Sequence, residues 1–409
     1  MQEARDHDAM KWLGRGYVPS RTAWYNFRDR AARFIEQVHT QIVQRAIDEE
    51  LVDPTIGVQD GTSIAAAASR HRMINRSTLD KRIEILDAVI AETFTEETPN
   101  WVPPTASGRL DLRQRMDTAS EVLNQRIQAN AEKPRDKRKD PSKIVVSTSD
   151  PDAPLGRDKM KVYRPMYTVQ LMVAAYSYII LSYLCEPSST DAGTLAPMID
   201  KTKAIVGDRL QEVHADCGYT SILDLKACRE RNIQLVAPVA ATPSKQKSDA
   251  EKIAREDFIW DAQNNCYRCP AGNDLKYLDR GRKQRQGGQF IWESRYRSNP
   301  EDCQGCSLLA GCLKNGATRK TLKRLEGQEL VDEQRQRMTD PAMQKHLKLR
   351  GQTVETAFAD AKGHRKMSSF HGRGLVRVRA ESGLLVVAQN IMHLDNIEKK
   401  RANPSQSTA

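Results

Sequence analysis

Apolar runs of strand length and apolar repeats of helical spacing alternate along this chain. One short run, residues 55–58, comes just before Asp60, and a second, residues 210–213, comes just before Asp216. Runs of this length are typical of buried strands. Apolar residues that recur every three to four positions, or fill a span between predicted strands, favour helices at residues 64–98, 109–132, 190–205, 219–231 and 376–399.

The remaining segments extend this pattern. Residues 1–50 have helical spacing after a helix start at Pro19-Ser20. Residues 165–185 carry no charge and have the length of a membrane span, but they are rich in Tyr, Ser and β-branched residues, which favours two adjacent buried strands. With further strands beginning at Ile144 and at 233–238, the chain is predicted to form an α/β fold, a mixed sheet flanked by helices.

Charge and cysteine content narrow the function. The 64 Lys and Arg outnumber the 53 Asp and Glu, and the net charge of +11 favours a polyanionic partner, most often nucleic acid. Five of the eight cysteines lie between Cys266 and Cys312, which indicates a metal site and not a disulfide framework. Without the charged-then-apolar pattern of a secretion signal, a reducing, cytoplasmic location is expected.

Three acidic residues stand in settings that suit metal chemistry. Asp60 and Asp216 each follow a predicted strand, and Glu355 lies in a helical segment with Lys362 seven residues further on. Carboxylates that converge in a fold repel one another unless divalent cations lie between them. Hard oxygen ligands suit Mg²⁺ or Mn²⁺, which serve two-metal cleavage and transfer of phosphodiesters.

The residues around these acids occur in a characteristic order. Asp60-Gly-Thr follows one strand, Ala-Asp216-x-Gly-Tyr follows another, and Arg-x3-Val-Glu355-x2-Phe-x3-Lys lies near the C-terminus. This order resembles the DDE transposases of bacterial insertion sequences, in the branch with a cysteine-containing insertion before the glutamate. The resemblance runs from about residue 12 to residue 394.

The resemblance implies a site and an activity. Asp60, Asp216 and Glu355 would hold two Mg²⁺ ions about 3.5–4 Å apart. The enzyme would cut DNA at transposon ends and transfer the freed 3′ hydroxyl to target DNA, as a nucleoid-associated homodimer on DNA with no membrane partner. Asp150 and Asp152, which also follow a strand, compete with Asp60 for the first position, and we favour Asp60.

Two alternative functions stay open. One is an N-terminally shortened transposase that binds DNA as an inactive or regulatory remnant. The other is a ribonuclease H-like nuclease that cuts without strand transfer.

The predicted elements fit a ribonuclease H-like sheet with two insertions. The expected division is an N-terminal helical segment, 1–50; a DDE catalytic domain, 51–239 and 346–399, with a helical insertion, 64–143; a Cys-rich insertion, 240–345; and a disordered tail, 400–409.

The Cys-rich insertion allows two zinc-binding sets. The pairs Cys266/Cys269 and Cys303/Cys306 have the spacing of a zinc ribbon. The family pattern instead combines Cys269, Cys303 and Cys306 with Cys312. A structural zinc ion is the first expectation, and small buried thiols are the alternative.

Basic residues near these motifs are candidates for DNA contact. The resemblance assigns Arg350 and Lys362 to phosphates, and the Gly-broken segment after Lys362 reads as a DNA-facing loop. The basic stretch 280–285 also suits phosphates. His214 and His371 are expected to be structural or DNA-contacting. The candidate DNA-binding residues are Arg350, Lys362, His364, Arg365, Lys366, Arg280, Arg282, Lys283 and Arg285.

Overall fold

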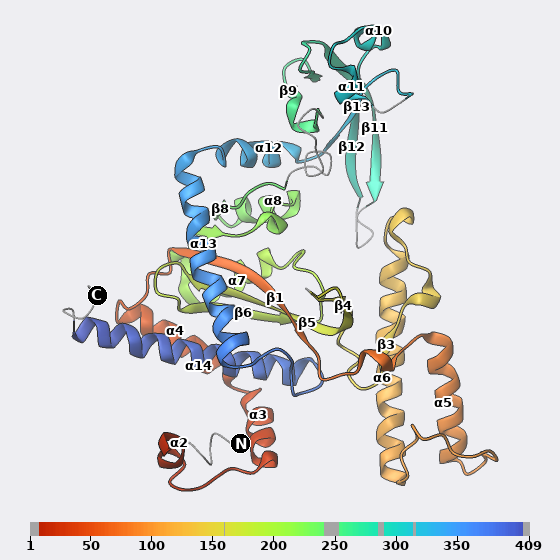
Figure 1. Cartoon of the computed structure of the whole chain (residues 1–409), viewed down its shortest axis with the longest axis vertical. Helices are drawn as coiled ribbons and strands as arrows, with labels where there is room; N and C mark the ends of the chain where they lie inside the picture. The colour runs from red at the N-terminus through yellow and green to blue at the C-terminus, as the bar shows by residue number, and fades with distance from the viewer. Residues whose placement is uncertain (1–7, 159, 241–252, 285–289, 314–315, 404–409) are drawn as a thin grey trace.

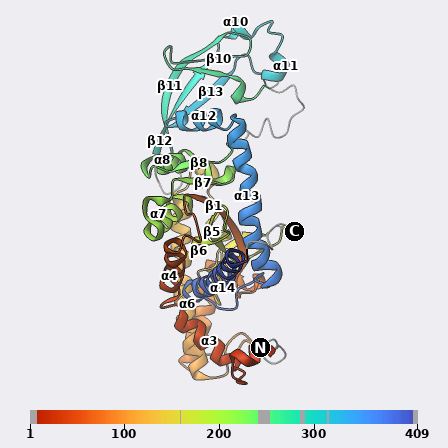
Figure 2. The ribbon, with the colours of Figure 1, turned by 90° about the vertical axis from the view of Figure 1, so that its left-hand side faces the viewer.

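The computed structural model describes residues 8–158, 160–240, 253–284, 290–313 and 316–403. The molecule is elongated (Figure 1): a central sheet carries helices, a pair of helices stands beside it, and a second sheet lies at one end. The first helices of the chain lie at the opposite end from the second sheet (Figure 2).

The central sheet is mixed. Its strands are β1 (Ile56–Ala65), β4 (Leu155–Arg157), β5 (Tyr163–Ala174), β6 (Ile180–Glu186), β7 (Glu212–His214) and β8 (Gln234–Val236). They follow the order β6-β5-β1-β7-β8, and β4 pairs with the start of β5. β1, β7 and β8 are mutually parallel, whereas β5 is antiparallel to β1 and to β6.

Helices pack on both faces of this sheet. They are α4 (Ile35–Asp48), α7 (Leu195–Val206), α8 (Ile222–Glu230), α13 (Pro341–Ala359) and α14 (Leu375–Ala402). Met172 of β5 belongs to a core shared with α4, α7 and α8. The next residue, Val173, belongs to a core shared with α13 and α14. Successive strand residues point to opposite faces, so β5 contributes to both cores.

The two strands expected over residues 165–185 are confirmed as β5 and β6. Among the helices of the described residues, none is long and apolar enough to cross a membrane.

The helix expected from residue 64 begins later. β1 continues to Ala65 because residues 63–65 pair with residues 166–168 of β5. The helix α5 (Arg76–Ile90) starts only after Asn75, whose side chain accepts a hydrogen bond from the backbone of Thr78. Helix propensity is a weak preference, and pairing in a buried sheet overrides it.

A helical pair beside the sheet has its own core. α5 packs on α6 (Ala106–Ala131), and β2 (Met73–Ile74) pairs with β3 (Val146–Ser147) next to them. The strand expected from Ile144 is therefore present as β3, but the prediction that it joins the central sheet is wrong. Its partner β2 lies in the segment read as helix, which hid the pairing.

The cysteine-rich part forms the second sheet, with the order β13-β12-β11-β10-β9 and antiparallel pairs. Its elements are β9 (Ile259–Asp261), β10 (Cys266–Arg268), β11 (Asp274–Gln284), β12 (Phe290–Arg297), α10 (Pro300–Cys303), α11 (Leu309–Cys312) and β13 (Thr321–Leu325). The helix α12 (Gln328–Arg337) leads from this sheet back to α13 (Figure 1).

The chain ends are partly helical. α2 (Asp8–Leu13) precedes α3 (Arg21–Ala31), which begins at Ser20 as expected, since the Ser20 hydroxyl accepts from the backbone of Ala23. α14 extends to Ala402, so the start of the expected disordered tail is helical. Residues 404–409 lie outside the described residues. Short turns of helix are η1 (Arg70–Arg72), η2 (Arg135–Lys137), η3 (Pro141–Lys143), η4 (Gly207–Arg209), η5 (Cys217–Tyr219), η6 (Arg255–Asp257) and η8 (Asp360–His364).

A buried histidine makes the fold sensitive to acid. His39 of α4 is 1% exposed and lies 2.9 Å through Nε2 from the carbonyl oxygen of Ile180. Burial lowers its pKa to about 4 from 6.5. As pH falls, His39 therefore binds a proton in the unfolded chain before it does so in the folded protein. The free energy of unfolding should fall by about 3 kcal/mol between pH 6.5 and pH 4.

Urea unfolding at pH 7.5, 6 and 4.5 checks this. His39→Gln should lose less stability over that range than the wild type, whereas His71→Gln, at an exposed position, should follow the wild type. Parallel losses in all three proteins would contradict the assignment to His39.

Candidate active site

The two aspartates lie side by side because of strand register. In the parallel pair of β1 and β7, Val58 is opposite His214. Asp60 lies two residues after Val58 in β1, and Asp216 lies two residues after His214, just past the end of β7. Alternation turns both side chains to the face of Val58, which α13 covers. Asp60 thus lies inside β1 and not at its end, and Asp216 caps η5 by accepting from the backbone of Gly218 at 2.7 Å.

The charges of neighbouring acids act on Asp60. Burial raises the pKa of Asp60, and the charges of Asp216 and Asp191 raise it further. Arg350 of α13 opposes this effect, with Nη2 2.7 Å from Oδ2 of Asp60. The backbone N–H of Gly61 also donates to Asp60 at 2.8 Å. Among the described residues, the site therefore gathers more negative charge than Arg350 balances, which favours a bound cation.

Asp191 is a member of this group that sequence reasoning missed. Gln170 of β5 donates to its Oδ1 at 2.5 Å, and the hydroxyl of Tyr219 donates to Gln170 at 2.7 Å. Burial raises the pKa of Asp191, and Asp216 contributes. Its position just before α7 reads as an ordinary helix start, so no local signal marks it.

The same contacts explain the glycine of Asp60-Gly61. A Cβ at Gly61 would collide with the side chains of Gln170 and Asp191. The dipeptide is therefore not a turn: Gly61 is a strand residue where only hydrogen fits beside its partner Gln170.

The third predicted acid is placed differently. Glu355 lies on α13 and is exposed, and no described contact joins it to Asp60 or Asp216. Five residues separate it from Arg350, so it leaves the helix about 140° away from the residue that reaches Asp60. Lys362, in η8, instead contacts β1 through the hydroxyl of Thr62.

Asp150 and Asp152, the alternatives to Asp60 as the first acid of the site, have structural partners. Asp150 accepts from the hydroxyl of Tyr167 at 2.7 Å and from the backbone of Gly374 at 3.1 Å. Asp152 accepts from the backbone of Leu375 at 2.9 Å. Both carboxylates therefore bind the N-terminus of α14, where backbone N–H groups and the helix dipole favour negative charge. This arrangement favours Asp60 over Asp150 and Asp152.

Several candidate DNA-binding residues already have partners. Arg280 and Arg282 stack on Trp292 at 4.5 and 5.2 Å, and Lys283 pairs with Glu293 at 3.2 Å. Arg365 pairs with Asp360 at 2.6 Å. His364 and Lys366 are exposed. Arg285 lies outside the described residues.

Four cysteines lie around one cavity beside the second sheet. Cys269, Cys303, Cys306 and Cys312 line one cavity. Burial raises the pKa of Cys312, and the other three thiols contribute. Cys266 is buried in β10 and does not line this cavity. The geometry favours the set that includes Cys312 over the set that includes Cys266.

Comparison with known proteins gives one result. Residues 268–394 match the model of a family described as a transposase DDE domain. The matched stretch holds the four cysteines of the cavity and Glu355 and leaves out Asp60 and Asp216. Searches of curated proteins and of solved structures give no match. The match confirms the resemblance seen in the sequence motifs and supports a DDE transposase of the insertion-sequence type.

Proposed function

We propose that this transposase cleaves DNA at the ends of an insertion sequence and transfers the freed 3′ hydroxyl to target DNA. The observation that carries the proposal is the register of β1 and β7, which sets Asp60 beside Asp216 under α13. Glu355, within the matched domain, is the third acid.

The donor set fits a divalent cation. Asp60, Asp216 and Asp191 bring carboxylates together with Arg350 as the close counter-charge. We assign Asp60 and Asp216 as ligands of Mg²⁺ or Mn²⁺, with Glu355 as the third acid of the set. Such a cation supplies charge stabilisation at the phosphodiester and an activated nucleophile.

Arg350 suits a DNA phosphate next to the aspartates. One nitrogen binds Asp60, while its Nε is buried without a hydrogen-bond partner in the described part of the chain. A guanidinium presents donors that match phosphate oxygens in pairs. Lys362, His364, Arg365 and Lys366 lie further along the same segment and would follow the DNA backbone.

The strand order supports a ribonuclease H-like catalytic domain. The order β6-β5-β1-β7-β8, with β1, β7 and β8 parallel, is built from residues 51–239, and α13 and α14 from 346–399 cover one face. We propose 1–50, the helical 64–143 and the Cys-rich 240–345 as added units. A homodimer on DNA, associated with the nucleoid, is part of this proposal.

We assign a structural zinc ion to Cys269, Cys303, Cys306 and Cys312. Four thiolates are a closed tetrahedral set, and such sites contribute directly to folding. A backbone N–H, that of Asn273, already donates to the sulfur of Cys269 at 3.3 Å.

The zinc content of cysteine variants tests this assignment. Cys303→Ser should lose about one zinc ion per chain, whereas Cys266→Ala should keep it. Elemental analysis of the two purified variants beside the wild type is the measurement. Loss of zinc in Cys266→Ala with retention in a Cys312→Ser variant would favour the other set.

A DNA-binding protein that does not cut is the second candidate, because Glu355 is exposed and no described contact joins it to Asp60 or Asp216. The test is incubation of the full chain with labelled insertion-sequence ends, a target plasmid and Mg²⁺. Joined products support the proposed transposition. Cut but unjoined ends indicate a nuclease, and a mobility shift alone indicates the non-cutting protein.

A further inference from the structure

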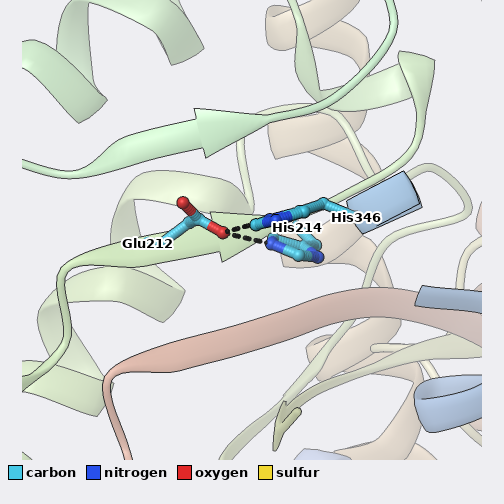
Figure 3. A group of neighbouring side chains, drawn as sticks. All are labelled: Glu212, His214 and His346. Atoms are coloured by element: carbon cyan, nitrogen blue, oxygen red, sulfur yellow. Dashed lines mark hydrogen bonds and ion pairs between the residues drawn. The ribbon is translucent and has the colours of Figure 1, made fainter. Parts of the chain in front are cut away.

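A second polar cluster lies on β7, separate from the three aspartates. Glu212 and His214 are two residues apart in β7 and so share one face. His346 comes from α13, which crosses that face. The three side chains point toward one another (Figure 3).

The geometry of the trio is that of a ligand set. Oε1 of Glu212 lies 2.5 Å from Nε2 of His214 and 3.2 Å from Nδ1 of His346. One ligand atom from each residue lies within 4.8 Å of the others, and among the described residues this is the group of three that meets that condition. The imidazole rings lie 5.5 Å apart between centroids.

The hydrogen bonds of the trio satisfy its buried groups only in part. His214 is fully buried, and its Nδ1 has no partner in the described part of the chain. One oxygen of Glu212 contacts both histidines, which recovers little of the cost of burying polar groups. His346 is 39% exposed, which leaves an entry route from solvent. Nε2 of Gln234 holds the other oxygen of Glu212 at 3.0 Å, as outer partners of metal ligands do.

We propose that Glu212, His214 and His346 bind one divalent transition-metal ion, zinc foremost. Two imidazoles and a carboxylate form a set that zinc accepts, with water at the remaining position. This chemistry differs from the hard oxygen donors at Asp60 and Asp216, so the two sites select different ions. This proposal differs from the expectation that His214 is structural or DNA-contacting.

An ion bound by the trio would affect the position of α13. β7 leads directly to Asp216, and His346 precedes Arg350 by one helical turn on α13. An ion shared between them would fix α13 over the aspartates. Ion binding by the trio does not depend on the proposed reaction.

Zinc binding by the full chain is the test. Wild type and His346→Ala are dialysed against a mild chelator and titrated with zinc in excess Mg²⁺, which keeps the aspartates occupied. We expect wild type to bind one more equivalent of zinc than His346→Ala. The affinity of the trio for zinc should be at least about tenfold weaker in that variant. His71→Ala, at an exposed histidine, is the control and should match wild type. His346→Asn and circular dichroism of each variant show whether the fold is kept.

Co²⁺ in place of zinc identifies the ligands. In the wild type, the Co²⁺ site that is absent from His346→Ala should show visible absorption bands without a sulfur-to-metal charge-transfer band. This spectrum distinguishes the trio from a site made by the cysteines. Equal zinc binding in wild type and His346→Ala would overturn the proposal and leave a hydrogen-bonded cluster. A lost site that carries the sulfur band would overturn it too.

Discussion

Asp216→Ala is expected to lower cleavage of insertion-sequence DNA by at least about 10³-fold, because a cation that has lost a ligand no longer stabilises the phosphodiester charge. Asp60→Ala should have the same effect, since the β1–β7 register places the two carboxylates together. DNA binding should stay close to the wild-type value, because these acids repel phosphates when no cation is present.

Loss of folding would not explain that result. The charge of Asp216 raises the pKa of Asp60 and of Asp191, so removing it relieves repulsion. Unfolding in urea should therefore show equal or higher stability for Asp216→Ala.

Asp208→Ala is the matched control, because this acid has a 98% exposed side chain in the turn just before β7. Cleavage rates with Mg²⁺ and gel-shift affinities for the variants decide the question. Metal-dependent cleavage that survives in Asp216→Ala would remove the two aspartates from the active site.

Asp150→Ala is expected to act on stability instead, lowering the free energy of unfolding by about 2–4 kcal/mol. Asp150 is completely buried and accepts from the hydroxyl of Tyr167, itself buried, and from the backbone of Gly374. The alanine variant leaves both donors unsatisfied and loosens the start of α14.

A second substitution separates this cause from others. Tyr167→Phe removes one stranded donor, so the double variant Asp150→Ala/Tyr167→Phe should be less destabilised than the sum of the two single variants. Asp208→Ala again serves as the exposed control. Urea unfolding at pH 7 measures the four variants and the wild type. Unchanged stability of Asp150→Ala together with lost cleavage would make Asp150, and not Asp60, the first acid of the site.

Local patterns in the sequence identified much of this protein. The uncharged stretch 165–185 encodes β5 and β6, because β-branched and aromatic residues suit a strand buried on both faces. The Arg-x3-Val-Glu355 segment predicted a helix, found as α13, and this third motif of the family resemblance lies in the matched domain. These features depend on residues close together in the chain.

Long-range pairing decided the rest. The extension of β1 through Ala65 depends on β5, about a hundred residues away, and the role of Asp150 depends on α14, more than two hundred residues away. No spacing within a local window encodes such partners.

The sequence by itself therefore determined the family resemblance, the helices and strands with clear periodicity, and Asp60, Asp216 and Glu355 as candidates. Only the tertiary structure brought Asp191 to Asp60 and Asp216, placed Cys312 in one cavity with three other cysteines, and placed His346 against Glu212 and His214. It also left Glu355 exposed on α13. The physical reason is that strand register and helix rotation fix side-chain direction, and both are set by packing between segments distant in sequence.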